Sequence, residues 1–446
     1  MKITVLSSKL VKPGCGSGAG APPSTQQHES IPLTMFDKVT FDQRISAMNF
    51  FHPPAPSTAV LETGLANALA TCRVWAGRLG VDSAGRRAII LNDAGARFVV
   101  ATADVALNGM LPLEPTPETQ SLHPSRHDVD ELLLVQVTQF TCGSYVVGYT
   151  LHHLVADGHA MATTMVAFGQ ATRGAAIDPV PVIDRASVFP PRSPLRVEFE
   201  HRGAEFKLPQ SENACSGGSV AGDEVVVHRV RFTRASISSL KSMAAPPTGV
   251  RPFSTVQCVV AHLWRCITAA RRLGGREITV ARVAVDGRAR MRHPPQEYIG
   301  NVVLWARPAA TAMELLETPL AHAAELVARA VARTDDRYFR SFIDFASSGA
   351  VEAERLAPTA DAAKMVLSPD VEVYSLLGFA FRNIDFGSGV PVFHMRGYVA
   401  EEGLVFLVPS LSGDGSVYAY VNLFRRDIDM FKDCCYSMLT EADSRL

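Results

Sequence analysis

The sequence lacks the features that mark several large classes of protein. Its 446 residues carry 43 basic and 44 acidic side chains, so there is no basic excess of the kind that nucleic-acid surfaces show. No run of 18 or more apolar residues occurs, and the N-terminus has neither the apolar region nor the cleavage site of a signal peptide. We therefore expect a cytoplasmic protein that binds neither nucleic acid nor membranes.

Paired cysteines and phosphate-binding glycine loops are also missing. Eight cysteines are scattered along the chain and none forms a Cys-x-x-Cys pair, which favours reduced, buried thiols over a zinc site or a disulfide framework. Neither the Walker nor the Rossmann glycine pattern occurs, so any nucleotide-containing ligand must be held in another way. Nothing indicates coiled-coil pairing, which is consistent with a monomer.

The element pattern predicts an α/β protein of two domains with mixed sheets. Strands and helices alternate in both halves without a strict βαβ rhythm. Periodicity fades over residues 191–222, which are rich in Pro, Gly and Ser, so we predict a linker there between domains at 1–190 and 223–446. Apolar spacing also predicts a helix over residues 56–80, with Gly80 ending it.

The stretch "SYVVGYTLHHLVADGHA" contains the most informative polar residues of the chain. An apolar strand, predicted to form a hairpin with "ELLLVQVTQF", ends in His152 and His153, and Asp157 follows. Side chains alternate along a strand, so the two histidines should point to opposite faces. Three interpretations are open: satisfied core histidines, a metal site that uses His159 as well, or a general base at His153 with Asp157 orienting the turn.

Two further blocks accompany this motif in the same chain. "VDGRARMRHPPQEYIGNVV" spans residues 285–303 and "FRNIDFGSGVP" spans residues 381–391. A DFG triplet also occurs in protein kinases, but the kinase His-Arg-Asp loop and Gly-rich loop are absent. In order and approximate spacing the three blocks resemble the BAHD acyltransferases, plant enzymes that move acyl groups from coenzyme A. "VLSSKLVKP" and "FDQRISAMNFFHPP" are similar to that family too, so the resemblance covers essentially the whole chain.

The resemblance implies two chloramphenicol-acetyltransferase-like domains with an active-site channel at their interface. It implies acyl-CoA as co-substrate, with no permanently bound cofactor and no metal. His153 would take the proton of the acceptor and pass it to the departing thiolate, as its near-neutral pKa allows. Asp157 would turn away from the substrate and pair with Arg288 or Arg290, holding the turn that presents His153.

The third block departs from the family pattern. Asp385, Phe386, Gly387 and Gly389 match it and are expected to be structural, but Ser388 stands where the family usually has tryptophan. In some members the tryptophan ring nitrogen lies close enough to help the oxyanion. Loss of one such donor can cost ~10²–10³-fold in rate. We therefore expect another donor or a different pocket shape, and a ligand-binding member with impaired catalysis remains an alternative.

A seat for coenzyme A is expected at the start of the helix "TVQCVVAHLWRCITAARR". Ser254 or Thr255 would cap it, and its free amides together with Arg251 would attract an anion. A plain helix cap explains the same residues.

Other segments, such as "FHPPAPSTAVLE" and "SFIDFASSGAVE", are similar in sequence to cereal N-hydroxycinnamoyltransferases, which acylate agmatine, tryptamine, tyramine or related amines. The resemblance predicts transfer of a hydroxycinnamoyl group from acyl-CoA to an amine, giving a phenolamide. Transfer to an alcohol, giving an ester, is the alternative.

The acceptor pocket is expected around "SPDVEVYS". Asp370, Glu372 and Tyr374 share one face if this segment is a strand, although a solvated strand edge would show the same pattern. One carboxylate beside an aromatic ring would suit tryptamine or tyramine, and agmatine, which carries two positive charges, would prefer two acids. Phe36 and Phe406 are candidates to line a slot for the cinnamoyl ring.

Overall fold

The computed structural model divides the chain into two units, each folded around a sheet of its own. Unit 1 comprises residues 1–192, 292–302 and 379–398, and unit 2 comprises residues 193–291, 303–378 and 399–446. The described residues are 1–14, 29–107, 109–185, 187–208, 223–246, 251–292, 294–361 and 364–443.

Each unit is built from separate segments of the chain, whereas the predicted domains are continuous, at residues 1–190 and 223–446. Unit 1 gives way to unit 2 after Arg192, close to the predicted boundary at residue 190, yet it also takes up two short segments from the second half of the chain. Of the predicted linker, residues 209–222 lie outside the described residues. Residues 193–208 belong to unit 2, where the buried His201 ring bonds Ser341 at 3.0 Å and Glu205 at 2.8 Å.

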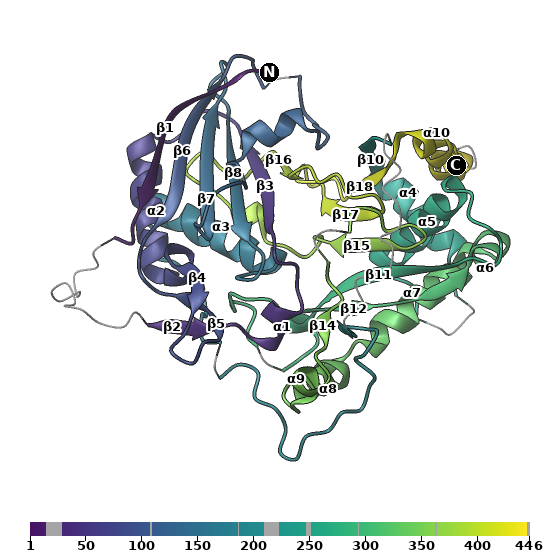
Figure 1. Ribbon diagram of the computed structural model, residues 1–446. Coiled ribbons are helices and arrows are strands. Elements are labelled where there is room, and N and C mark those ends of the chain that lie inside the picture. The colour runs from purple at the N-terminus through teal and green to yellow at the C-terminus, as the bar shows by residue number, and fades with distance from the viewer. Residues whose placement is uncertain are drawn as a thin grey trace. The chain divides into compact units, whose positions relative to one another are not determined.

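Unit 1 contains a six-stranded mixed sheet in which β6 and β7 run parallel and the other neighbours antiparallel (Figure 1). In spatial order its strands are β1 (Ile3–Val11), β6 (Ala96–Ala103), β7 (Leu133–Gln139), β8 (Tyr145–His152), β3 (Arg44–Phe51) and β16 (Phe393–Arg396). A smaller sheet consists of β2 (Ser30–Pro32), β5 (Arg87–Ile90) and β4 (Arg78–Val81).

β8 lies inside the large sheet and every one of its residues is buried. A strand covered on both faces is a continuous apolar run, which explains why "YVVGYTLH" shows no polar alternation. Its antiparallel pairing with β7 confirms the predicted hairpin, and Gly143 adopts a φ of +81° in the turn. Gly148 allows a close approach, since a Cβ there would lie 2.0 Å from the Leu122 carbonyl oxygen.

The helices of unit 1 include a closely packed pair, α2 and α3 (Figure 1). A Cβ on Gly64 would lie 2.3 Å from the Thr172 hydroxyl oxygen, so only glycine permits this approach. The prediction of a helix as far as Gly80 is wrong, because α2 ends at Thr71 and Gly80 lies in β4. The helices and 3₁₀ turns of unit 1 are α1 (Met35–Lys38), α2 (Thr58–Thr71), η1 (Arg73–Ala76), η2 (Glu118–Leu122), α3 (Gly158–Thr172) and η4 (Phe381–Asn383).

Unit 2 contains a seven-stranded mixed sheet in which β15 runs parallel to both of its neighbours. In spatial order its strands are β10 (Val225–Phe232), β18 (Val417–Phe424), β17 (Leu404–Pro409), β15 (Val371–Ser375), β11 (Ile278–Asp286) and β12 (Val303–Ala306), with β13 (Ala309–Thr311) also on β11. Two sheet-containing units with mixed strand order confirm the predicted fold class.

The buried helix predicted after Ser254 is α5, which packs on α4, α7 and α10 beside this sheet (Figure 1). None of the helices in the described part of the chain is long and apolar enough to cross a membrane. The helices and short elements of unit 2 are β9 (Phe206–Lys207), α4 (Arg234–Met243), α5 (Thr255–Ala270), η3 (Gly287–Ala289), α6 (Ala312–Glu317), α7 (Leu320–Arg333), α8 (Asp336–Ala346), α9 (Ala350–Ala353), β14 (Ala357–Pro358), η5 (Arg425–Asp427) and α10 (Ile428–Asp443).

Candidate active site

His153 is the first residue after β8, and its backbone amide donates to the Gln43 carbonyl at 2.8 Å. The two histidines contact different groups, as strand alternation predicts. His152 Nε2 lies 3.6 Å from an Asp42 carboxylate oxygen, whereas His153 Nδ1 lies 3.2 Å from the Asn301 side-chain oxygen. Burial lowers the pKa of His152 to about 4, so at neutral pH that ring is an uncharged part of the core.

Asn301 holds the His153 ring and was not identified from the sequence. Its side-chain nitrogen donates to the His153 carbonyl at 2.8 Å and to Asp37 Oδ1 at 2.9 Å. The Thr40 hydroxyl adds a second contact to His153 Nδ1 at 3.3 Å. With Nδ1 held in this way, the other ring nitrogen, Nε2, is the one available to a substrate.

Asp37 and Arg185 form a buried ion pair behind Asn301. Both side chains are fully buried, and Arg185 Nε lies 3.1 Å from Asp37 Oδ2. Burial lowers the pKa of the Arg185 guanidinium, but the charges of Asp37, Tyr298 and Asp157 outweigh it and the net shift is upward. The guanidinium therefore keeps its positive charge, and this ion pair was also missed by the sequence analysis.

Asp157 connects the histidine turn with the segment that carries Asn301. It is the N-cap of α3, where Oδ1 accepts from the Ala160 amide at 3.0 Å, and its Oδ2 accepts from the Val302 amide at 3.0 Å. It thus fixes both the start of the helix after His153 and the residue after Asn301.

The two arginines predicted to pair with Asp157 belong to unit 2. Arg288 is buried and its guanidinium lies 3.1 Å from Asp286, while Arg290 is exposed. Their pairing with Asp157 stays a prediction.

The environment of His153 favours an uncharged imidazole ring, in which one nitrogen is free of a proton and can accept one. Burial lowers its pKa below the ordinary value of a histidine. A backbone hydrogen bond, the charge of Asp157, the bond to Asn301 and the charge of Asp37 act in the opposite direction. A neutral ring that is stabilised once it gains a proton suits general base catalysis.

The Asp-Phe-Gly block forms a loop in unit 1. Asp385 accepts from the amides of Gly387 at 2.7 Å and Gly389 at 3.0 Å, and both glycines have positive φ. Phe386 is buried against Phe168, with ring centroids 4.8 Å apart. These contacts are structural.

Ser388 is far from His153 and cannot help an oxyanion formed beside that ring. Its hydroxyl lies 2.5 Å from the hydroxyl of Tyr145, the first residue of β8, whereas His153 follows the last residue of the same strand. At ~3.3 Å per residue the strand separates them by roughly 25 Å. The expectation of another donor or a different pocket shape in place of the tryptophan stays a prediction.

The expected coenzyme A seat is a regular helix cap. Ser254 accepts from the Gln257 amide at 3.2 Å and its own amide donates to Gln257 Oε1 at 2.7 Å, a capping box at the start of α5. Thr255 is the first helical residue, and Arg251 is exposed. These contacts explain the local sequence, and a role in binding coenzyme A stays a prediction.

The expected acceptor residues separate into two groups. Tyr374 donates to Glu372 at 3.1 Å and stacks on Phe406, with ring centroids 4.8 Å apart. Asp370 lies elsewhere, because its Oδ1 accepts from the Val280 amide at 2.9 Å. Phe36 is a core residue of unit 1.

Glu372 is buried and pairs with Arg282. Burial raises the pKa of Glu372 despite that arginine. Burial also raises the pKa of Tyr374 well above its ordinary value, and both Glu372 and Glu401 add to this rise. The charges of Glu372 and Glu401 therefore both act on Tyr374, and the charge of Arg282 opposes them.

The metal alternative for the histidine motif needs three ligands close together. Within the described residues such a group occurs in unit 2, where the ligand atoms of His262, Cys266 and Cys435 lie within 4.8 Å of one another. A hydrogen bond with Cys435, together with burial, raises the pKa of the Cys266 thiol well above its ordinary value. All three residues are buried, and none of them belongs to the histidine motif.

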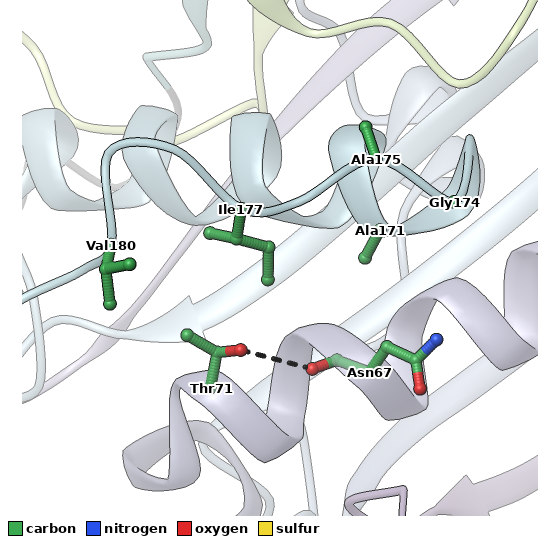
Figure 2. A pocket seen from close by; sticks show the side chains of 7 residues that line it. All are labelled: Asn67, Thr71, Ala171, Gly174, Ala175, Ile177 and Val180. Carbon is green, nitrogen blue, oxygen red and sulfur yellow. Dashed lines mark hydrogen bonds between the residues drawn. The ribbon is translucent and has the colours of Figure 1, made fainter. Parts of the chain in front are cut away.

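A pocket of about 310 Å³ lies between α2 and the segment that follows α3 (Figure 2). Figure 2 shows that Asn67 and Thr71 supply its polar atoms from one side. None of its lining residues is titratable, so it offers no group for acid–base chemistry. They are Asn67, Thr71, Ala171, Gly174, Ala175, Ile177 and Val180.

Comparison with known proteins gives matches along the whole chain. The family model described as the Transferase family matches residues 1–438. "Agmatine hydroxycinnamoyltransferase 1" of Oryza sativa subsp. japonica is 57% identical over 98% of this chain and 99% of its own length. "Agmatine coumaroyltransferase-1" of Hordeum vulgare is 58% identical over 98% of this chain and 100% of its own length. "Tryptamine hydroxycinnamoyltransferase 2" of the same rice is 37% identical over 98% and 99%, respectively.

Solved structures with the same fold include an enzyme crystallised with coenzyme A. Vinorine synthase matches with a TM-score of 0.71 at 21% identity, covering 98% of both chains. F. graminearum TRI101, complexed with coenzyme A and deoxynivalenol, matches with a TM-score of 0.73 at 18% identity, covering 90% of this chain and 96% of that one. At these identities the likeness concerns the fold alone.

Proposed function

The chain belongs to the Transferase family, the BAHD acyltransferases, and on this premise we propose that it transfers a hydroxycinnamoyl group from coenzyme A to an amine, with agmatine as the first candidate. The family uses acyl-CoA as co-substrate, and the product would be a phenolamide. The observation that supports the chemistry is the His153 ring, which is held at Nδ1 and has no hydrogen-bond partner at Nε2 among the described residues.

The reaction needs one base and no covalent intermediate. The amine, which arrives as a cation, first loses one proton to solvent. Its nitrogen then attacks the thioester carbonyl, the carbon–nitrogen bond forms, and His153 Nε2 takes a second proton from the attacking nitrogen. The carbon–sulfur bond then breaks and the proton passes to the departing thiolate. A positioned base of this kind contributes roughly 10²–10⁴-fold.

We propose agmatine as the acceptor, in place of the arylamine that the sequence favoured. The arylamine preference is not supported, since relatives named for agmatine are 57–58% identical and the one named for tryptamine is 37% identical. The argument from one acid also loses its premise, because Glu372 and Glu401 both act on Tyr374. Two carboxylates suit an acceptor with two cationic groups, and an alkylamine with a pKa of roughly 10 arrives charged.

Several parts of this proposal go beyond the family assignment. We keep Arg251, Ser254 and Thr255 as the coenzyme A seat, and Glu372 with Phe406 as part of the substrate pocket. We also propose that the enzyme works as a cytoplasmic monomer. Ester formation with an alcohol, and ligand binding without turnover, are the alternatives.

The test measures thiol release from p-coumaroyl-CoA with agmatine, putrescine, tyramine, tryptamine and shikimate, using the wild type, His153→Ala and the matched control His152→Gln. We expect agmatine to give the highest kcat/KM, His153→Ala to lose at least 100-fold, and His152→Gln to retain activity. Turnover with shikimate alone would favour ester formation. Thermal stabilisation by coenzyme A with no thiol release from any acceptor would favour the binding-only alternative.

A further inference from the structure

The Asp37 carboxylate is surrounded by hydrogen-bond donors. Oδ1 accepts from the backbone amide of Asn301 at 3.2 Å and from its side-chain nitrogen at 2.9 Å. Oδ2 accepts from the Thr34 amide at 2.8 Å and from Arg185 Nε at 3.1 Å. A carboxylate with four donors around it acts only as an acceptor, so the nitrogen of the Asn301 amide group must face Asp37.

This arrangement fixes the other end of the Asn301 side chain as well. With its nitrogen committed to Asp37 and to the His153 carbonyl, Asn301 presents its oxygen to His153 Nδ1 at 3.2 Å. An amide oxygen only accepts hydrogen bonds, so Nδ1 must carry the proton. Nε2 then has a lone pair, the form that a general base requires.

We propose that Asp37 is a positioning residue that, through Asn301, decides which ring nitrogen of His153 carries the proton; this rests on His153 being the general base of the proposed function. Asp37 acts at a distance and does not itself bind substrate.

A helix cap alone does not explain Asp37. Of the two Asp37 carboxylate oxygens, the capping box of α1 uses only Oδ2, which accepts from the Thr34 amide. The contacts of Oδ1 go to Asn301, which is 264 residues away in the sequence. Oδ2 of the carboxylate therefore bonds the start of the helix and the Arg185 guanidinium, whereas Oδ1 bonds Asn301, the residue that holds His153.

The direct test is Asp37→Asn. With its oxygen toward Thr34 and Arg185, the new side chain places an NH₂ group against Asn301. The Asn301 amide must then turn its oxygen toward that group and its nitrogen toward His153 Nδ1. This favours the tautomer protonated at Nε2, and we expect kcat to fall ~10²–10⁴-fold while the KM for acyl-CoA changes little.

The tautomer itself is measured by the ¹⁵N chemical shifts of the His153 ring in the resting protein, assigned by comparison with His153→Gln. The double variant Asp37→Asn/Asn301→Asp restores an acceptor to His153 Nδ1 and a partner to the new NH₂ group. We expect the double variant to recover the Nδ1–H tautomer and to have a kcat at least tenfold higher than that of Asp37→Asn. The recovery stays partial because the backbone amide of residue 301 loses its acceptor, the Asp37 Oδ1 atom.

Two further variants complete the experiment. Asp42→Asn removes a carboxylate beside His152 rather than His153, and we expect neither the His153 tautomer nor kcat to change. Asn301→Ala keeps Asp37 and leaves the Thr40 hydroxyl at Nδ1, which can either donate or accept, so the ring should become a mixture of tautomers even if Asp37→Asn fails to fold.

The outcomes separate this inference from the proposed function. A folded Asp37→Asn or Asn301→Ala protein that keeps a pure Nδ1–H ring overturns the role of Asp37, whatever its activity. A wild-type enzyme that acylates no amine, but whose tautomer changes in Asp37→Asn, keeps the positioning relationship and overturns the proposed reaction.

Discussion

Ser388 and His153 lie at opposite ends of β8, Ser388 bonded to Tyr145 at its start and His153 following its last residue. The serine that replaces the family's tryptophan therefore acts on the loop of the Asp-Phe-Gly block and on the buried phenol of Tyr145. Burial raises the pKa of that phenol to about 12, so it remains a neutral hydrogen-bonding group. The substitution removes no donor from the surroundings of His153, and an argument for impaired catalysis cannot rest on it.

Ser388→Ala should consequently affect stability and not the rate. It leaves the Tyr145 hydroxyl without its partner, which costs about 1–2 kcal/mol of unfolding free energy. Urea unfolding and kcat with the best amine measure the two effects, and Tyr145→Phe/Ser388→Ala serves as control because it removes both partners. A tenfold drop in kcat in a stably folded Ser388→Ala protein would contradict the distance argument.

Asp157→Ala should reduce both stability and activity. Removal of the cap of α3 should lower the free energy of unfolding by ~1 kcal/mol. The Val302 amide, left without its acceptor, should lower it by a further ~1–3 kcal/mol. Because Val302 follows Asn301, we expect the support of the His153 ring to loosen and kcat to fall at least tenfold.

Asp335→Ala is the matched control for this prediction. Asp335 caps α8 and accepts from the Tyr338 amide at 3.1 Å, but it belongs to unit 2. The Asp335→Ala variant should lose ~1 kcal/mol of unfolding free energy and keep the kcat of the wild type. Equal effects of both substitutions on kcat would mean that Asp157 acts as a cap and nothing more.

The elements with a strong local pattern could be predicted from the sequence. The apolar run of β8, the hairpin turn at Gly143 and the buried helix α5 all agree with the structure. The end of α2 was misplaced because the apolar residues after Thr71 fit a short 3₁₀ turn and β4 as well as a longer helix.

The support of His153 could not be predicted, because it is assembled from distant segments. Asp37 and Asn301 are 264 residues apart, and only the fold brings them together. The Gly300-Asn301 pair in the second block was the available signal, but nothing local showed that its side chain would reach a histidine. The identity of Ser388 was likewise visible in the sequence, whereas its distance from His153 was not.

Glu372→Gln should lower the preference for agmatine. Glu372 is one of two carboxylates whose charge acts on Tyr374, so its loss should weaken the binding of a doubly charged acceptor more than that of tyramine. The ratio of kcat/KM for agmatine to that for tyramine should fall at least tenfold, about 1.4 kcal/mol. This ratio is insensitive to the general loss of stability expected when Arg282 is left without its buried partner.

Asp370→Asn provides the comparison for Glu372→Gln. It makes the same change of charge just before β15, but Asp370 is occupied with the Val280 amide, which an asparagine oxygen can also accept. Its substrate ratio should stay within twofold of the wild type. A ratio that is unchanged in Glu372→Gln would remove this residue from the acceptor pocket.

Acid should destabilise unit 1 through histidines that are buried in their neutral form. Burial lowers the pKa of His123 to about 4, that of His152 to about 4 and that of His394 to about 3. An unfolded histidine has a pKa of about 6.5, so between these values the unfolded chain binds more protons and stability falls as the pH falls. Each histidine should contribute a loss of roughly 2 kcal/mol between pH 7.5 and pH 5.

Urea unfolding at several pH values between 7.5 and 5 measures this loss, and a single substitution assigns it. His123→Asn should reduce the slope of unfolding free energy against pH by the share of one histidine, because it removes a buried group that must lose its charge to fold. His127→Asn, at an exposed position four residues away, should leave the slope unchanged. Equal slopes in both variants would show that His123 makes no contribution, and would assign the loss in this pH range to His152 and His394.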